Sequence, residues 1–351
     1  MKQILTVLLY PFSILYDLGT RFRNHLYYIE HKKSFHFDTN VIAVGNLSVG
    51  GTGKTPVVEY VLRLLKNRKV ATLSRGYGRK TKGFRIADEQ DSAMSIGDEP
   101  YQFYRKFSDV MVTVGEDRAM AIPQVLYHQE NTEVIILDDA YQHRSVIPDF
   151  NVLLTEYGKP FFEDYVLPAG RLRESRKNAN RADVVVVTKC PNLVTPDTQK
   201  RYEDKIGRYT KSKVPVFFSE VKYQALKHVF GEQVSQPRRA FVFTGIANSS
   251  QFVKYLKSQF EVIAQQHFSD HFQYKEDDIL SLVADFDKVK GADTIMITTE
   301  KDMVRLMDPI FGKMFENRPV YYIPIEVSFL KDGSLFDEMV LNSIKTKSTL
   351  E

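Results

Sequence analysis

Residues 41–56 read VIAVGNLSVGGTGKTP, an apolar run that passes into a glycine-rich loop ending in Lys54 and Thr55. The apolar run predicts a buried strand, and the PVVEYVLRLLKNR that follows predicts an amphipathic helix. Backbone N–H groups in such a loop point at phosphate oxygens, and the positive end of the helix dipole faces the same anion. The stretch therefore predicts a polyphosphate-binding turn. The alternative is a glycine-rich turn that binds nothing, and the flanking strand and helix favour the nucleotide site.

The loop follows the pattern G-x-x-x-x-G-K-[ST] except at its first position, where Ser48 stands. Lys54 is expected to reach the β- and γ-phosphates, and the Thr55 hydroxyl to ligate Mg²⁺. Gly50 and Gly51 still allow the tight backbone path that the pattern requires. We therefore expect nucleotide contacts from Ser48, Val49, Gly50, Gly51, Thr52, Gly53, Lys54 and Thr55.

The composition describes an ordinary folded protein with about two domains. Of its 351 residues, 43% are hydrophobic and 26% are charged. The formal net charge of +4 is too weak to indicate a nucleic-acid partner. The single cysteine, Cys190, excludes an internal disulfide and a multi-cysteine metal site, which suits a reducing cytoplasm.

Residues 1–35 combine an apolar body with a basic rim. The uncharged run from residue 3 to residue 16 is 14 residues long, shorter than the ~20 that cross a bilayer. Five lysines and arginines against two acidic residues give the segment a net charge of +3. This pattern predicts an amphipathic segment on an anionic membrane surface. The alternative is a helix that packs on the protein core, and Pro11 is expected to break or kink any helix here.

Short apolar runs recur along the chain and alternate with helical stretches; they include VATL, VMVTV, VIILDD, FNVLLT and VVVVT. This alternation predicts an α/β fold resembling P-loop NTPases, with a mostly parallel sheet covered by helices on both faces. The composition shifts near residue 212, which predicts a second, smaller α/β domain. We expect the N-terminal segment at 1–35, a nucleotide-binding domain at 36–213, and a domain at 214–351 that closes the cleft, with its last helix free to pack back on the first domain.

Two carboxylates, Asp138 and Asp139, end the apolar run VIILDD. Ligands of open α/β sheets bind at the carboxyl ends of the strands, and P-loop enzymes place a magnesium-holding carboxylate there. We expect at least one of the pair to hold Mg²⁺; the alternative is a helix cap. Gln142 and His143 follow one turn later and can face the same cleft.

Other charged segments are individually ambiguous. Asp98 and Glu99 precede Pro100, which is good chemistry for a helix N-terminus with no function needed. The string QQHFSDHFQY places two histidines, at 267 and 271, around an aspartate, and structural and functional roles are about equally expected.

Two further segments can also be explained without a role in binding or catalysis. Arg171 and Arg173 lie in a glycine-proline loop and suit a phosphate or a transition-state charge, with a solvated surface as the alternative. In ITTEKDMVRL, Thr298 or Thr299 is expected to cap a helix, with a nucleotide or substrate contact as the less expected role.

Together these strings resemble the tetraacyldisaccharide 4′-kinase family of lipid A biosynthesis. The matching strings, in the family's order over about three quarters of the chain, are VGNLSVGGTGKTP, SRGYGRK, GDEP, GEDR, ILDDAYQHR, LPAGRLRE, VVTK, FTGIANS, FSDHF and TTEKD. The chain departs from the family at Ala140-Tyr141, where Gly-Phe is common, and at residues 171–174, where Pro-Leu-Arg-Glu is common. Neither departure removes a presumed catalytic atom.

The resemblance implies a kinase that uses ATP and Mg²⁺. Its reaction moves the γ-phosphate to the 4′-hydroxyl of a tetraacyl glucosamine disaccharide 1-phosphate, making the bis-phosphorylated lipid A precursor lipid IVA. The resemblance also implies a cytoplasmic enzyme that lies peripherally on the inner face of the cytoplasmic membrane of a Gram-negative bacterium. It implies no nucleic-acid partner.

The resemblance also implies roles for single residues. Asp98 and His271 form a dyad that takes the proton of the attacking hydroxyl, and Lys54 assists catalysis. Because the two dyad residues fall in different predicted domains, closure of the cleft would assemble the site. Glu99 joins Thr55, Asp138 and Asp139 as a metal ligand. Expected substrate contacts are Asn46, Tyr77, Arg118, Gln142, His143, Arg171 and Arg173.

Two other functions remain open at this point. A regulatory GTPase or metallochaperone NTPase would share the loop, but guanine readers want Asp where VVVVTKCPN has Pro191. An ATP-gated peripheral membrane adaptor would keep the loop and the apolar N-terminus but would have no need of Asp98 with His271.

Overall fold

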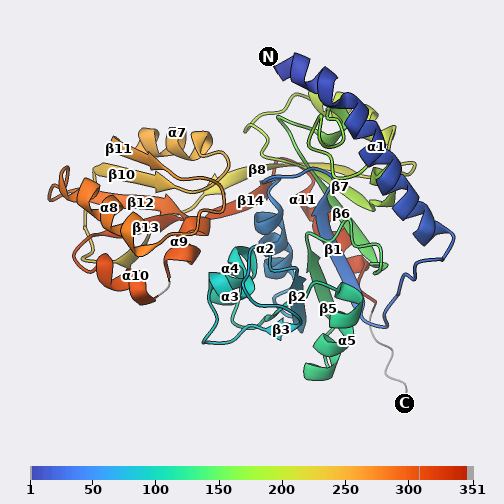
Figure 1. Cartoon of the computed structure of the whole chain (residues 1–351), viewed down its shortest axis with the longest axis horizontal. Helices are drawn as coiled ribbons and strands as arrows, with labels where there is room; N and C mark the ends of the chain where they lie inside the picture. The colour runs from blue at the N-terminus through green and yellow to red at the C-terminus, as the bar shows by residue number, and fades with distance from the viewer. Residues whose placement is uncertain (1, 308, 346–351) are drawn as a thin grey trace.

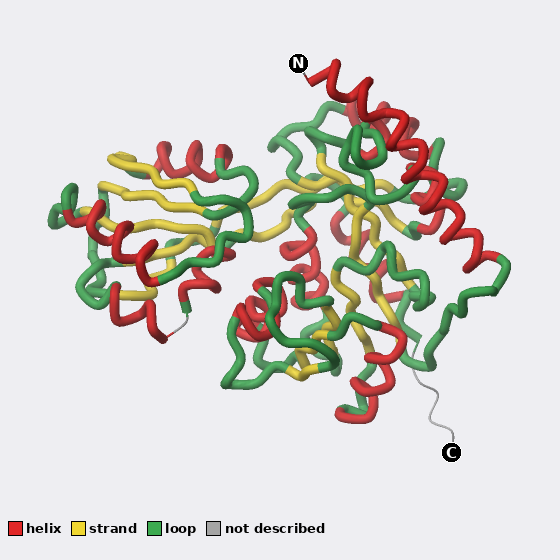
Figure 2. Tube along the Cα trace, in the orientation of Figure 1, coloured by secondary structure: helices red, strands yellow, loops and turns green. Residues whose placement is uncertain are grey.

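The computed structural model describes residues 2–307 and 309–345 as two sheets covered by helices (Figures 1 and 2). The larger sheet has nine strands in the order β14-β8-β7-β6-β1-β5-β2-β4-β3. Neighbouring strands are parallel except in the outermost pairs, β14–β8 and β3–β4. This confirms the predicted α/β fold. The strands are β1 (Asn40–Asn46), β2 (Val70–Ser74), β3 (Arg85–Ile86), β4 (Met111–Val114), β5 (Val134–Asp138), β6 (Phe150–Glu156), β7 (Val184–Thr188), β8 (Val216–Tyr223) and β14 (Ile325–Phe329).

Side-chain alternation explains how the large sheet is covered on both faces. In β1, Ile42 and Val44 pack on one face, and Val41 and Ala43 pack on the other. Every residue of β1 is buried. A strand buried on both sides reads as a continuous apolar run, which is why the unbroken VIAV predicts a central strand.

The helices of the large sheet form two layers. One face is covered by α2 (Lys54–Leu64), α4 (Asp98–Lys106) and α11 (Gly333–Asn342), which share a core with Phe103 and Phe336. The opposite face is covered by α5 (Arg118–His128) and α6 (Pro196–Gly207). The short helix α3 (Ala93–Ile96) and the 3₁₀ turns η1 (Phe161–Glu163) and η2 (Arg176–Arg181) complete this part.

The smaller sheet has five strands in the order β11-β10-β12-β13-β9, all parallel except the β13–β9 pair. Helix α7 packs on one face, and α8, α9 and α10 pack on the other. The elements are β9 (Lys227–Phe230), β10 (Arg239–Thr244), α7 (Ser250–Gln259), β11 (Glu261–His267), α8 (Glu276–Asp287), β12 (Thr294–Thr299), α9 (Glu300–Leu306), α10 (Pro309–Met314) and β13 (Val320–Ile323).

The chain crosses between the two sheets twice, and the crossings lie side by side. β8 leaves the large sheet and β14 returns to it, paired antiparallel along their length (Figure 1). The strands β8 and β14, which fall within the range 214–351, thus belong to the large sheet, and α11 packs on it, as the expectation for the last helix allows. The physical reason is burial: Phe217, Val327 and Phe336 all lie in the large sheet's core.

Helix α1 (Lys2–Tyr28) lies along the outside of the large unit, over the loop at 164–174 (Figure 1). Ser13 anchors it: its Oγ donates to the Val166 carbonyl at 2.8 Å and accepts from the Ala169 N–H at 2.9 Å. The helix passes Pro11 without the expected break. Pro11 and Val7, the residue four positions earlier whose carbonyl loses its donor, are both exposed. Among the residues that the structure describes, no helix has the length and apolarity to span a bilayer.

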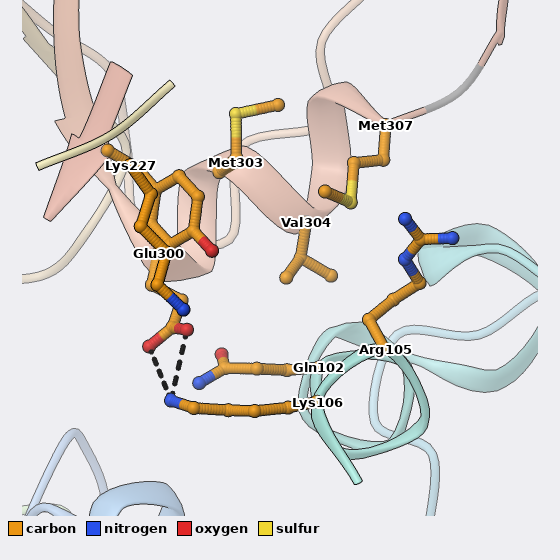
Figure 3. A pocket seen from close by; sticks show the side chains of 9 residues that line it. Gln102, Arg105, Lys106, Lys227, Glu300, Met303, Val304 and Met307 are labelled. Carbon is orange, nitrogen blue, oxygen red and sulfur yellow. Dashed lines mark hydrogen bonds and ion pairs between the residues drawn. The ribbon is translucent and has the colours of Figure 1, made fainter. Parts of the chain in front are cut away.

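The two units meet where α9 packs on α4. An apolar cluster joins Val304 of α9 to Ile96, Tyr101 and Val114. Beside it lies a small cavity of about 250 Å³, in which Lys106 of α4 reaches Glu300 of α9 (Figure 3). This contact brings the ends of α4 and α9, with their charged residues, to the mouth of the nucleotide loop.

Candidate active site

The glycine-rich loop lies at the carboxyl end of β1, where ligands of open α/β sheets bind. Gly53 caps α2 with a φ of +83°, a conformation that suits glycine. The end of β7 holds the loop carbonyls: Thr188 Oγ1 donates to the Thr52 carbonyl at 2.7 Å, and Lys189 Nζ donates to the Gly51 carbonyl at 2.5 Å. The contacts with the end of β7 therefore hold the loop in place, and α2 begins directly after it at the carboxyl edge of the sheet.

Ser48 has a structural reason to replace the usual glycine. Its φ is not positive, and it forms an antiparallel bridge with Leu172. The N–H of Val49 donates to the Arg171 carbonyl at 2.8 Å. The start of the nucleotide loop is thus paired with the loop at 164–174, a contact that the sequence does not reveal.

Asp138 and Asp139 lie at the end of β5 beside this loop, and their pKa values are shifted in opposite directions. Burial, together with Asp139 and Glu99, raises the pKa of Asp138 to about 7. Its Oδ1 is buried and has no hydrogen-bond partner. Burial alone would also raise the pKa of Asp139, but Lys54 at 3.7 Å and the two-pronged Arg173 lower it to about 2. The pair is an anionic site with one carboxylate oxygen still unsatisfied.

Asp98 and His271 meet although they are 173 residues apart. His271 Nδ1 lies 3.2 Å from Asp98 Oδ2, and Arg305 donates to the same oxygen from Nε at 2.9 Å and Nη2 at 2.7 Å. Burial alone would raise the pKa of Asp98, but the hydrogen bonds from His271 and Arg305 outweigh it and lower the pKa. The residue next to Asp98, Glu99, is near enough to Asp138 to raise its pKa, so the dyad lies beside the nucleotide loop.

Several expected substrate residues gather around the same loop. The Asn46 carbonyl accepts from Gln142 Nε2 at 2.8 Å and from Arg173 Nη2 at 3.1 Å. Asn46 Nδ2 also donates to Thr52 Oγ1 at 2.5 Å. Tyr77 lies edge-on to His271, with ring centroids 5.4 Å apart, and is 68% exposed. Burial, then the nearby arginines 118 and 75, lowers the pKa of His143 to about 4, so its ring is neutral.

Two other expected substrate residues are bound to protein groups. Arg118 is fully buried beside the carboxylate pair: it donates to the carbonyls of Gly115 and Glu116 at 3.0 and 3.1 Å and to that of Asp138 at 3.5 Å. Burial lowers its pKa to about 10. Arg171 binds Asp164 at 2.8 Å. Substrate contact by these two residues stays a prediction.

Two residues of α9 enter the site without having been singled out from the sequence. Lys301 Nζ lies 3.1 Å from His271 Nε2 and 3.0 Å from Glu99 Oε1. Arg305 holds Asp98, as described above. The predicted cap of this helix is confirmed at Thr299, whose side chain accepts from the Asp302 N–H. The available signal was the i, i+4 spacing of Lys301 and Arg305, which places both on one face of the helix.

Comparison with known proteins identifies the family. Residues 5–345 match the family model described as tetraacyldisaccharide-1-P 4′-kinase. The chain belongs to this family. The kinase family predicted from the sequence strings is thereby confirmed, and membership favours neither the GTPase nor the adaptor alternative.

Relatives of this kinase family match along nearly the whole chain. A tetraacyldisaccharide 4′-kinase of Flavobacterium johnsoniae is 43% identical over 98% of this chain and 98% of the relative. One of Parabacteroides distasonis is 40% identical over 97% and 95%. The crystal structure of LpxK from Aquifex aeolicus in complex with ATP is similar with a TM-score of 0.74, at 31% identity, over 97% of this chain and 100% of that chain.

Proposed function

We propose that this chain transfers the γ-phosphate of ATP to the 4′-hydroxyl of a tetraacyl glucosamine disaccharide 1-phosphate. The observation that carries the proposal is the pairing of Asp98 with His271 across the two units, beside a nucleotide loop. A protein that only binds or hydrolyses a nucleotide does not need a carboxylate–imidazole pair that takes the proton of an attacking alcohol. The family's name supports the choice of acceptor.

Phosphoryl transfer requires positioning and charge neutralisation above all. The 4′-oxygen forms a bond to the γ-phosphorus, the bond from that phosphorus to the bridging β–γ oxygen breaks, and ADP leaves. The proton of the hydroxyl passes to Asp98. Its Oδ2 already accepts from His271 and Arg305, whereas none of the described residues bonds its Oδ1, which is the oxygen left for the substrate. Lys54 and the loop N–H groups hold the phosphates.

The residues around Asp138 fit a magnesium ion. Its buried, unpartnered Oδ1 is an oxygen that a hard cation would satisfy. No cluster of three or more metal-binding side chains occurs in the described part of the chain, and Mg²⁺ at phosphates needs only one or two carboxylates. Thr55 and Asp138 would hold the ion, with Asp139 or Glu99 as a second carboxylate, and the ion would neutralise charge on the phosphate oxygens.

Helix α1 supports a peripheral position on a membrane. Its outward side carries large exposed apolar side chains: Val7, Leu8, Phe12, Ile14, Leu15, Leu18 and Phe22. Basic residues follow at 21, 23, 32 and 33. A lipid with four acyl chains stays in the bilayer, so the enzyme must come to it. We infer binding to the cytoplasmic face of the inner membrane, with α1 beside the loop that carries Arg173; Tyr16 OH donates to its carbonyl at 3.3 Å.

The transfer is tested by incubating the protein with ATP, Mg²⁺ and extracted disaccharide lipid and then measuring the lipid's mass for one added phosphate. Asp98→Asn is expected to lower kcat by roughly 10²–10⁴, the usual contribution of an acid–base group. Nucleotide affinity should stay unchanged. Asp285→Asn, at an exposed ion pair with Lys288, is the matched control. No phosphate gain with the unaltered protein would contradict the proposal.

Membrane binding is tested separately by sedimentation with anionic vesicles. Leu8→Glu with Leu15→Glu should release the protein into the supernatant, because two charges would enter the apolar side of α1. Leu193→Glu is the control, since Leu193 is 81% exposed, more than Leu8 at 64% and Leu15 at 66%, and lies in a loop outside α1. Equal sedimentation of all three proteins would contradict the role of α1.

A further inference from the structure

Both ring nitrogens of His271 are occupied by groups of known polarity. Nδ1 faces Asp98 Oδ2 at 3.2 Å, and Nε2 faces Lys301 Nζ at 3.1 Å. The edge of the Tyr77 ring flanks the imidazole. Two further charged residues lie next to these partners of the ring: Arg305 binds Asp98, and Glu99 binds Lys301.

The two neighbours together assign one protonation state: Asp98 requires a proton on Nδ1, and Lys301 excludes one on Nε2. An ammonium has three donors and no acceptor, so Nε2 must offer Lys301 its lone pair. Asp98 is a carboxylate held by two guanidinium hydrogen bonds, so its oxygen accepts and Nδ1 must donate. The ring is therefore neutral, with its proton on Nδ1. A second proton on Nε2 would place two donors face to face.

We propose that Lys301 is a positioning residue that keeps His271 neutral and protonated on Nδ1 during the reaction. The inference rests on the proposed kinase function and assigns its site a further part. A neutral ring supports Asp98 with an ordinary hydrogen bond. An imidazolium would carry a second donor on Nε2, which would face the donors of the Lys301 ammonium at 3.1 Å. Lys301 thus fixes the orientation of the ring that holds Asp98.

The contact to Glu99 suits this role. Lys301 lies between His271 and a carboxylate, with Nζ 3.0 Å from Glu99 Oε1, so its ammonium is fixed in place. Its side chain is only 27% exposed. The geometry thus restrains the donor as well as the ring, which a solvated lysine could not do.

The direct test is the ¹⁵N spectrum of the His271 ring in the full-length protein at pH 7, with His271→Gln used to assign its signal among eight histidines. The unaltered protein should show a protonated Nδ1 and an unprotonated Nε2. In Lys301→Met, the ring should no longer be fixed in this tautomer, and the separate Nδ1 and Nε2 signals should move toward each other. Lys301→Arg keeps a donor and should keep the ring neutral. This readout needs no lipid substrate, so it fails or succeeds independently of the proposed function.

Kinetics give the second readout. Lys301→Met should lower kcat at pH 7 by about tenfold while the KM for ATP stays within about twofold, because the ring no longer holds Asp98 in place for the proton transfer. Lys301→Arg should stay near the original rate, and Lys257→Met, at an exposed lysine of α7, should change nothing. A protonated Nε2 in the unaltered protein, or a ring unchanged by Lys301→Met, would overturn the proposal. If Lys301→Met does not fold, Lys301→Leu takes its place in both measurements.

Discussion

The buried charges around Lys106 give the sharpest stability prediction. Lys106 Nζ lies 2.7 Å from Glu59 Oε2 and 3.0 Å from Glu300 Oε1. Glu59 belongs to α2, Lys106 to α4 and Glu300 to α9, so one ammonium ties three helices and both units together (Figure 3). Lys106→Met keeps most of the side-chain volume but leaves two buried carboxylates without their shared cation.

The magnitude follows from the surroundings of each carboxylate. Removing one partner of a buried ion pair costs about 3–5 kcal/mol. Glu59 retains Gln102 at 2.8 Å and Arg63 at 3.5 Å, so we expect the lower end, about 3 kcal/mol. With an unfolding entropy of about 2.1 cal/mol/K per residue, this corresponds to a fall in Tm of about 4 °C for a chain of 351 residues.

The loss should depend on pH. Burial, then the neighbouring Glu59, raises the pKa of Glu300 even with Lys106 present, and the substitution raises it further. As pH rises past the ordinary value of about 4.3, the unfolded chain ionises first, so the folded state loses stability until the raised pKa is passed. Lys106→Met should therefore be most destabilised near pH 8 and less so at pH 5.

Calorimetry of both proteins at pH 5 and pH 8 measures this. Lys205→Met is the matched control, since Lys205 pairs with Glu163 at 2.5 Å on the surface and should contribute about 1 kcal/mol or less. A fall in Tm below about 1 °C at pH 8, or an equal fall at both pH values, would refute the reasoning.

Two further predictions concern the nucleotide end of the site. Arg173→Met removes the two-pronged partner of Asp139, whose pKa is about 2. A depressed pKa stabilises the fold above the ordinary value of about 3.9 and this stabilisation is lost as pH falls toward 2. The Tm difference between the two proteins should thus be constant above about pH 4 and shrink below it, and a difference that does not shrink would count against the ion pair. Gly45→Ala should lower stability by about 1–3 kcal/mol, because the added Cβ would lie 2.7 Å from Tyr141 Cβ and 2.8 Å from its backbone nitrogen. Gly207→Ala, with open space around the new methyl group, should leave Tm unchanged or higher in the same melting experiment.

Features that depend on near neighbours in the chain could be predicted from the sequence. The strand, loop and helix at 41–64 are set by apolar periodicity and by glycines at the turn, which are local properties. The cap at Thr299 is local as well. The carboxylate pair at 138–139 follows from its place at the end of a buried strand, since parallel strands gather their carboxyl ends at one edge.

Arg118 shows where local reasoning stops. The family resemblance predicts a substrate contact for Arg118, and the Asp117 side chain just before it caps α5. The guanidinium nevertheless turns inward to the Gly115 and Glu116 carbonyls and toward the end of β5, where it is fully buried. Which way a first-turn side chain points depends on the adjacent strand of the folded sheet, and the sequence around 118 does not encode that strand.

The meeting of Asp98 with His271 required the family resemblance, because it depends on how two units dock. Helix α9 has only seven residues, too few to be stable by helix propensity alone. Three of its charged residues are instead bound to α4: Glu300 to Lys106, Lys301 to Glu99, and Arg305 to Asp98. Lys301 also contacts His271, and Arg305 also donates to the Gly245 carbonyl. Separating the two units would break the Lys106–Glu300 and Arg305–Asp98 contacts at the same time as it removes His271 from Asp98. Assembly of the base and closure of the units are therefore one event, since the same short helix makes both sets of contacts.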